Sequence, residues 1–173
     1  MKAHALKELF DKGYGFKVFQ GHNNNPNSLK VQTILESIEL DEEVKDKLDA
    51  LKKNHYVICL GENWCPDCTI NETIMHKVGE CQPSIQIKHL PREGYESLVS
   101  SFDPDGKARI PLILLMDDAF NLMGTFNEVP KIVHKAMESG DQTQVIVAKR
   151  KYRNGEFLKE TCLEFIEIFE RSE

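Results

Sequence analysis

The segment from residue 55 to residue 79 limits the choice of fold most strongly. Residues 56–60 (YVICL) are continuously apolar and are closed by Gly61, the pattern of a strand covered on both faces. From Pro66 to Gly79 the apolar residues recur at helical spacing. A buried strand that leads directly into a helix is typical of an α/β protein with helices packed on a sheet.

Residues 80–140 continue this alternation. We expect strands over 84–90, 111–116 and 120–126, and helices over 94–102 and 130–140. This order predicts two parallel crossovers followed by a hairpin. The sheet should therefore be mixed, with helices on both faces.

Helical segments flank this region. In residues 1–54 the apolar spacing predicts three helices, one ended by Gly13, one capped by Ser28 and one capped by Asp41, with a loop at the Asn-rich residues 23–25. Near the end, residues 145–147 fit a strand or a helix, and residues 158–169 fit an amphipathic helix. With no repeat or long linker visible, we expect one domain over 1–173: an N-terminal extension (1–54), a core (55–140) and a C-terminal extension (141–173).

The composition of the chain limits the kinds of partner that it is expected to bind. The chain of 173 residues carries 22 Lys and Arg against 28 Asp and Glu, a formal net charge of −6. This balance gives no attraction to phosphate backbones, so we expect no nucleic-acid partner. No apolar run approaches the roughly 20 residues of a membrane helix, and the first residues lack the apolar core of a signal peptide. We therefore expect no membrane partner and a cytoplasmic location.

Two of the five cysteines stand where the first strand of the core leads into its helix. An odd, sparse set of cysteines argues against a disulfide framework and leaves redox or metal-binding roles. In the sequence Trp64-Cys65-Pro66-Asp67-Cys68, Pro66 is expected to be the first helical residue, with Cys65 as the cap. Unpaired N–H groups and the helix dipole then lower the pKa of Cys65 and favour its thiolate. The spacing lets Cys68 reach Cys65, so Cys65 can attack a disulfide and Cys68 can resolve it.

This segment resembles the W-C-x-x-C active site of the thioredoxin-like superfamily. Ile110-Pro111, directly before an apolar strand, resembles the position of the superfamily's cis-proline, and the expected element order over 55–140 agrees. The helical extensions are similar to those of a bacterial branch of the superfamily. The resemblance implies an α/β fold, the thioredoxin-like three-layer αβα arrangement around a central mixed sheet, and thiol-disulfide oxidoreductase activity.

The resemblance also implies roles and partners. Ile110 would present backbone groups to a substrate strand, and Pro111 would pack beside the thiols and discourage metal capture; the residues alone also fit a trans proline that opens the strand. Trp64 is expected to form an apolar wall for the substrate, and Arg109 is either a surface charge or a neighbour of the thiolate. The implied partners are a disulfide-containing protein and an upstream reductase or low-molecular-weight thiol, with no cofactor and no metal.

One departure from thioredoxin concerns proton transfer. Cys59 stands where thioredoxin has a buried acid that helps to deprotonate the second cysteine. Glu62 or Glu72 acting through water is one substitute for this acid, but ordinary burial preferences predict solvated side chains for both. The remaining thiols are expected to be small buried fillers, and the histidines, which lack metal-ligand spacing, to be surface or hydrogen-bonded residues: Cys59, Cys81, Cys162, His55, His76 and His89.

Two other functions are also compatible with the sequence. Cys65 and Cys68 supply half of a tetrahedral zinc site, but the chain lacks a second C-x-x-C or a suitably spaced Cys/His pair. A non-catalytic adaptor or redox sensor on the same fold is the other alternative, because a fold does not determine a function.

Overall fold

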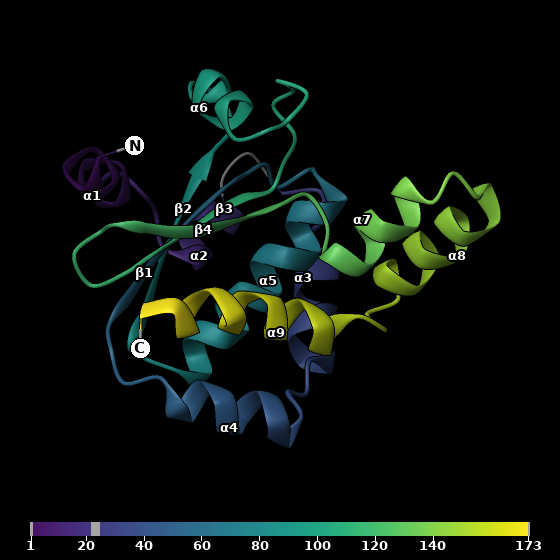
Figure 1. Cartoon of the computed structure of the whole chain (residues 1–173), viewed down its shortest axis with the longest axis horizontal. Coiled ribbons are helices and arrows are strands. Elements are labelled where there is room, and N and C mark those ends of the chain that lie inside the picture. The colour runs from purple at the N-terminus through teal and green to yellow at the C-terminus, as the bar shows by residue number, and fades with distance from the viewer. Residues whose placement is uncertain (1, 22–24, 173) are drawn as a thin grey trace.

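The computed structural model describes residues 2–21 and 25–172 and centres on a four-stranded sheet in the order β2-β1-β3-β4. β1 (His55–Gly61) pairs in parallel with β2 (Ile85–Pro91) and, on its other side, antiparallel with β3 (Leu112–Met116). β4 (Leu122–Asn127) completes the sheet antiparallel to β3. The predicted strands and the mixed sheet are confirmed (Figure 1).

The direction of β3 shows that one prediction was wrong. We expected two parallel crossovers, but only α5 (Pro66–Cys81) makes one in the described chain, between β1 and β2. The connection from β2 to β3 contains α6 (Glu96–Ser101), which has 6 residues. Such a helix rises about 9 Å, less than the roughly 23 Å length of a seven-residue strand. It does not return the chain along the sheet, so β3 runs opposite to β1.

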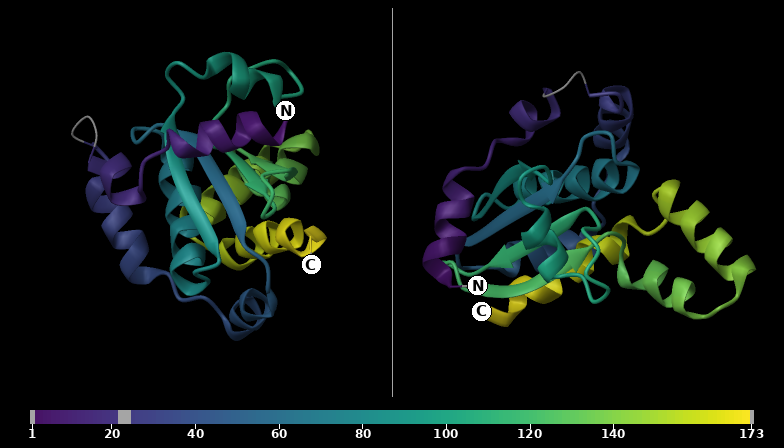
Figure 2. Two further views of the ribbon diagram at one scale, coloured as in Figure 1. Left: turned by 90° about the vertical axis from the view of Figure 1, so that its left-hand side faces the viewer. Right: turned by 90° about the horizontal axis from the view of Figure 1, so that it is seen from above.

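Helices cover both faces of the sheet, as the sequence predicts. On one face α5 and α9 (Leu158–Phe169) pack on the strands, and α4 (Glu42–Ala50) packs against both helices. On the other face, α1 (Ala3–Asp11) and α6 cover a second apolar cluster. The three layers are seen from two further directions in Figure 2.

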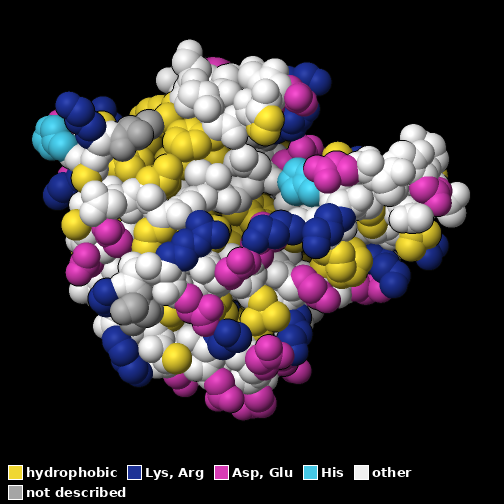
Figure 3. Space-filling view, in the orientation of Figure 1, with side chains coloured by type: hydrophobic (Ala, Val, Ile, Leu, Met, Phe, Trp, Pro, Cys, Tyr) yellow, Lys and Arg dark blue, Asp and Glu magenta, His cyan; other side chains and the backbone are white. Residues whose placement is uncertain are grey.

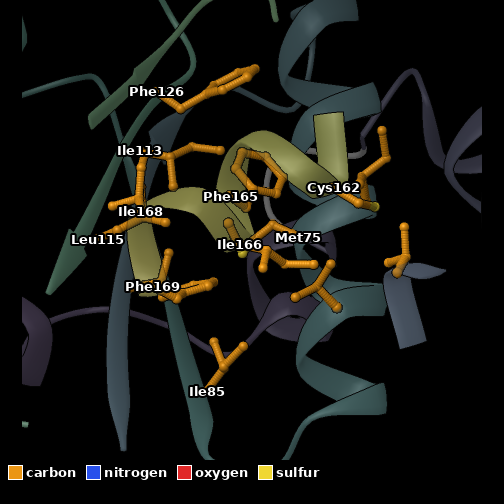
Figure 4. Packing of buried hydrophobic residues seen from close by; sticks show 14 of the residues in the cluster. Met75, Ile85, Ile113, Leu115, Phe126, Cys162, Phe165, Ile166, Ile168 and Phe169 are labelled. Carbon is orange, nitrogen blue, oxygen red and sulfur yellow. The ribbon is translucent and has the colours of Figure 1, made fainter. Parts of the chain in front are cut away.

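The larger core lies between α5, α9 and the sheet. Phe165 and Phe169 of α9 are fully buried, and the Phe165 ring meets that of Phe126 edge to face at 5.0 Å (Figure 4). Burying each such ring stabilises the fold by roughly 1.5–3 kcal/mol. This packing fixes α5, and therefore the Cys65–Cys68 segment at its first turn, against the sheet.

The N-terminal extension differs from the prediction at two points. A short helix not expected from the sequence, α2 (Phe16–Gly21), lies against β2. In α3 (Ser28–Ser37), Ser28 is the first helical residue rather than the cap, which is Asn27. The Asp41 cap of α4 is confirmed, because its carboxylate accepts the Val44 N–H at 2.9 Å. Of the Asn-rich run at 23–25, residues 23 and 24 lie outside the described residues.

The C-terminal extension is helical throughout its described length. Residues 145–147, which fit two structures in the sequence, belong to α8 (Gln142–Arg153). α8 packs on α7 (Lys131–Glu138), and the two project from the body of the molecule (Figures 1 and 2). The predicted helix over 158–169 is α9, followed by a turn of 3₁₀ helix, η1 (Glu170–Ser172).

The surface carries both charged and hydrophobic side chains. On the face seen in Figure 3, Lys and Arg alternate with Asp and Glu, and hydrophobic side chains gather between α1 and α6. Within the described ranges, every helix is too short or too polar to cross a lipid bilayer.

Candidate active site

The turn between β1 and α5 holds the two predicted thiols. As the sequence predicts, α5 begins at Pro66 and Cys65 is its N-cap. The Cys65 Sγ accepts the backbone N–H of Cys68 at 3.4 Å. A sulfur atom therefore occupies the position at which a cap oxygen usually satisfies the open N–H groups of a helix.

The surroundings of Cys65 favour its thiolate. A hydrogen bond from the Cys68 thiol lowers the pKa of Cys65, and the backbone N–H groups of Cys68 and Asp67 lower it further. Burial and the Asp67 carboxylate act in the opposite direction, but the net shift of the Cys65 pKa is downward. With 7% of its surface exposed, Cys65 is the more exposed thiol of the pair.

Cys68 lies deeper and is held as a thiol. It is 2% exposed, and burial raises its pKa well above the usual value. The hydrogen bond to Cys65 and the charge of Glu72 raise it further, whereas the Glu62 N–H, 3.5 Å from Cys68 Sγ, lowers it. The surroundings therefore favour ionisation of Cys65 and oppose ionisation of Cys68.

The cis-proline segment lies against the first thiol. The Ile110-Pro111 peptide bond is cis, as the resemblance implies, and not the trans alternative that the residues alone allowed. The Ile110 carbonyl lies 3.8 Å from Cys65 Sγ, although 45 residues separate them in sequence. The fold therefore brings together the predicted thiol and the predicted substrate-binding backbone.

Trp64 stands outside the core beside the thiols. Its side chain is 53% exposed, which excludes a role as core filling. The guanidinium of Arg92 lies 5.7 Å from the Trp64 ring, and Arg92 Nη1 donates to the Ala108 carbonyl at 3.5 Å. Arg92 thus links the Trp64 turn to the segment before the cis-proline, a role that its isolated position in the sequence gave no reason to suspect.

Arg109 points toward carboxylates rather than toward the thiolate. Its guanidinium donates to Asp103 at 3.0 Å and to Asp105 at 2.5 Å, and lies 3.9 Å from Glu128. Of the two roles left open for Arg109, the structure supports that of a partly exposed charge in an ion-pair cluster. Glu128 also acts on Asp67, since burial and the Glu128 charge raise the pKa of Asp67.

Glu72 corrects the prediction of a solvated side chain. It is 0% exposed, and its Oε2 lies 2.8 Å from Nδ1 of His89, which is also fully buried. A Cβ atom at Gly61 would overlap Glu72 Oε1 and lie 2.8 Å from Cys68 Sγ. The carboxylate and the second thiol are therefore neighbours over Gly61. Glu62, by contrast, is half-buried and accepts the Glu93 N–H at 3.1 Å.

Two sequence signals point to this pair. Glu72 follows Cys68 by four residues, so both lie on the same side of α5. His89 shares the parity of Ile85 and Ile87 along β2, which places it with the apolar residues of that strand.

The remaining cysteines divide into two groups. Cys59 and Cys162 are fully buried, as predicted for small fillers, and burial raises the pKa of both. Cys81 is exposed at the end of α5, so the prediction of a buried filler was wrong there. It is the last residue of the helix, beyond the stripe that packs on the core. Over residues 2–21 and 25–172, no group of three or more His, Cys, Asp or Glu side chains is arranged to hold a metal ion.

Sheet topology, a dithiol at the start of α5 and a cis-proline beside it define a thioredoxin-like protein. The family model described as thioredoxin matches residues 13–145, and the chain therefore belongs to the thioredoxin family. It is similar to the crystal structure of a protein of unknown function from Pseudomonas aeruginosa, with 29% identity, all of both chains covered and a TM-score of 0.82. It is also similar to an HIV epitope-scaffold, with 28% identity, 95% of this chain and 97% of that chain covered and a TM-score of 0.81. No curated protein matches the sequence.

Proposed function

We propose that this protein is a thiol-disulfide oxidoreductase that reduces protein disulfides in the cytoplasm. The observation that carries the proposal is the contrast between the two thiols of α5. Cys65 has a lowered pKa and lies beside the Ile110 carbonyl, whereas Cys68 is buried with a strongly raised pKa. A nucleophile that ionises more easily than an ordinary thiol and a resolving thiol that ionises less easily suit the two steps of disulfide exchange.

In this mechanism the Cys65 thiolate attacks one sulfur of a substrate disulfide, and the other sulfur leaves as a thiolate. Cys68 then attacks Cys65 in the resulting mixed disulfide, the substrate is released in its dithiol form, and Cys65 and Cys68 become a disulfide. An upstream reductase or a low-molecular-weight thiol returns the pair to the dithiol. Trp64 and the Ile110-Pro111 backbone provide the contact surface for the substrate.

Turnover of a protein disulfide tests the proposal. The purified protein, with dithiothreitol as the electron source, should accelerate reduction of insulin disulfides, and its Cys65/Cys68 pair should titrate as one two-electron couple against glutathione. A protein that neither turns over insulin nor forms the Cys65–Cys68 disulfide would contradict the proposal.

A binding function is the second candidate, and one surface favours it. The projecting α7 and α8 carry exposed apolar side chains, among them Ile132, Ile146 and Val147. An adaptor would use such a surface while its dithiol stays inactive or acts as a sensor. Redox inertness in the insulin and glutathione measurements would favour this function over the enzyme.

The zinc-module alternative is tested separately. Protein purified under reducing conditions should contain well under one equivalent of zinc, and a chelator should not lower its melting temperature, because structural zinc contributes directly to folding. Stoichiometric zinc that is lost together with the fold on chelation would favour the metal-binding module.

A further inference from the structure

A cavity of about 390 Å³ lies between α5 and the two helical extensions. Its walls come from α3 on one side and from the end of α8 and the start of α9 on the other, with α5 between them. We call it the α3–α8 cavity. Because the N-terminal and C-terminal extensions each supply a wall, residues 55–140 alone do not form it.

The side of the α3–α8 cavity that α5 forms is apolar. Ile70 and Ile74 are 4% and 3% exposed, and they line the cavity together with Ile34 of α3 and Leu158 of α9. None of these side chains has a polar group, so this side offers a ligand hydrophobic contact. An apolar side chain that enters the cavity removes hydrocarbon surface from water, which favours binding.

Two cations line the same cavity nearer to solvent. Lys30 of α3 is half-buried, and Arg153 at the end of α8 is exposed. Neither forms an ion pair with another residue of the described chain, whereas Lys151 of α8 lies 3.8 Å from Glu156. In a chain with a formal net charge of −6, this cavity therefore presents a local positive charge to an anion.

The α3–α8 cavity lies beside the thiols. Burial raises the pKa of Asp67, and the charges of Arg153 and Lys30 oppose this rise. Both cations are thus close enough to act on the residue that precedes Cys68. Burial also raises the pKa of Tyr152, which lines the cavity, and charge on the two active-site thiols raises it further.

The position of the isoleucines along α5 gives the reach that a ligand needs. Ile70 and Ile74 follow Cys65 by five and nine residues, so they lie roughly 8 and 14 Å from it along the helix axis. An extended peptide advances about 3.3 Å per residue. A peptide joined to Cys65 through its own cysteine therefore reaches the cavity with side chains about two to four positions away.

We propose that the α3–α8 cavity recognises a segment of the substrate protein in which an acidic and an apolar side chain lie two to four positions from the reacting cysteine. The acidic side chain lies at Lys30 and Arg153, and the apolar side chain lies over Ile70 and Ile74. A basic segment is repelled at the same place. The proposal rests on the proposed oxidoreductase function, and it gives both helical extensions a role in selecting the substrate.

The expected preference is several-fold in size. Asp67 faces the same two cations, so part of their attraction is already satisfied within the protein. Ion pairs at exposed positions also contribute little individually. Charge and hydrophobic contact should therefore each change the rate by a modest factor that a direct comparison of peptides can measure.

Peptides with a single cysteine, activated as the 2-pyridyl disulfide, test the preference. The Cys65 thiolate attacks the peptide sulfur, the bond between the peptide and pyridyl sulfurs breaks, and the pyridine thiolate leaves with the electron pair and takes a proton from solvent. Cys68 then bonds to Cys65, releases the peptide as a thiol and loses its own proton to solvent. Because Cys81 is exposed, it is replaced by serine in every protein used, so that it does not consume reagent.

The peptides differ in one side chain at a time. The first has glutamate two positions and leucine four positions after the cysteine; one partner has lysine for glutamate, another has serine for leucine, and a second set has the same order before the cysteine. Each rate is divided by that of the same peptide with 2-mercaptoethanol, which removes differences in intrinsic reactivity. In one of the two sets, the first peptide should react about fivefold or more faster than the lysine peptide and about threefold faster than the serine peptide. Added salt should reduce the first ratio and leave the second in place.

Variants of the cavity locate the preference. In a protein with both Lys30→Glu and Arg153→Glu, the lysine peptide should become the faster one. Thr33→Trp, at an exposed residue of the α3 wall, should fill the cavity and remove the leucine preference. Arg150→Glu is the matched control, because Arg150 is an exposed cation of α8 that does not line the cavity, and it should keep both preferences. The pyridyl disulfide of 2-mercaptoethanol, which has neither side chain, corrects for any change in the reactivity of Cys65.

The outcomes separate this proposal from the proposed function. Equal normalised rates in both peptide sets, from a protein that still reduces insulin, overturn recognition by the cavity and leave the oxidoreductase function in place. A glutamate preference that survives in the Lys30→Glu and Arg153→Glu protein also overturns it, because recognition then lies elsewhere. A protein in which none of the reagents produces the Cys65–Cys68 disulfide overturns both.

Discussion

The helices α9 and α2 both lie outside the Cys65–Cys68 segment, yet they contact the core with different chemistry. α9 places a hydrocarbon surface against the sheet, with Phe165 and Phe169 fully buried. α2 has only 6 residues and places two aromatic rings over the buried Glu72–His89 pair. The first contact resembles any hydrophobic core, whereas the second encloses ionisable groups.

The α9 contact and the α2 contact therefore differ in what they contribute to the stability of the fold. Burial of aromatic rings in an apolar cluster stabilises the fold regardless of pH. Covering a carboxylate and an imidazole with aromatic rings adds less to stability, because the buried polar atoms oppose it. Substitutions in the two regions should therefore change the stability of the fold by different amounts.

The thiols at the start of α5 and the thiol of α9 give the largest expected contrast. Cys65→Ser should abolish disulfide reduction, because no other thiol in the described chain caps a helix beside the cis-proline. Cys68→Ser should leave a mixed disulfide with the substrate, visible by mass spectrometry. Cys162→Ser, on α9, should cost stability at most and leave the insulin reaction intact.

The other thiols complete this test. Cys59→Ser and Cys81→Ser should also retain turnover, since neither thiol lies at the start of α5. Loss of insulin reduction in a folded Cys81→Ser protein would show that the reactive pair has been assigned wrongly.

A change in the α9 core gives the next largest effect. Phe165→Ala should lower the free energy of unfolding by about 3–5 kcal/mol, because it removes a fully buried ring from a packed cluster. Chemical denaturation measures this loss, with Leu29→Ala as a control at a side chain that is 75% exposed. At a temperature where the variant is folded, its rate of insulin reduction should match that of wild type. An altered rate would show that α9 also shapes the site.

The sequence predicted the apolar contact of α9 better than the contact of α2 with Glu72 and His89. Local patterns predicted these elements: helical spacing predicted α9, continuous apolar runs predicted strands, and Pro66 as the first helical residue predicted the Cys65 cap. α2 was missed because 6 residues give too few turns for a period to show. The burial of Glu72 was not predicted, because a glutamate on a helix is normally placed on a solvent-facing side. In α5 residues 68–75 are all buried, so this part of the helix has no solvent-facing side. The direction of β3 depends on the path of the whole connection from β2 to β3, and local sequence patterns do not predict that path.

The pH dependence of alkylation tests the difference in pKa between Cys65 and Cys68 at the start of α5. Cys65 should react with iodoacetamide with a midpoint below that of an unperturbed thiol, because hydrogen bonds lower its pKa. Cys68 in the Cys65→Ser protein should resist alkylation until much higher pH, because burial raises its pKa. As pH rises, the rate of each reaction increases through the pKa of its thiol. Equal midpoints for the two thiols would remove the contrast on which the proposed function rests.

The smallest expected effect concerns Asp67, which lies between the two thiols in sequence. Its backbone N–H lowers the pKa of Cys65, while its carboxylate raises it. Asp67→Asn keeps the N–H and removes the charge, so the Cys65 pKa should fall by somewhat less than one unit. Because a more stable thiolate favours the dithiol, the pair should become more oxidising by about 20 mV or less, given about 30 mV for each 1.4 kcal/mol. Asp67→His should shift the potential further, since an imidazolium stabilises the thiolate, and wild type should be the most reducing of the three.

Thiol alkylation against pH and glutathione equilibria for each variant measure the Asp67 effect. Glu128 and burial raise the pKa of Asp67, so its carboxylate becomes neutral at a higher pH than an exposed aspartate. The difference between wild type and Asp67→Asn should therefore shrink as pH falls toward the range where Asp67 is protonated. A Cys65 pKa that is unchanged or higher in Asp67→His would show that this side chain points away from the sulfur, and that the backbone of the first turn alone sets the reactivity of Cys65.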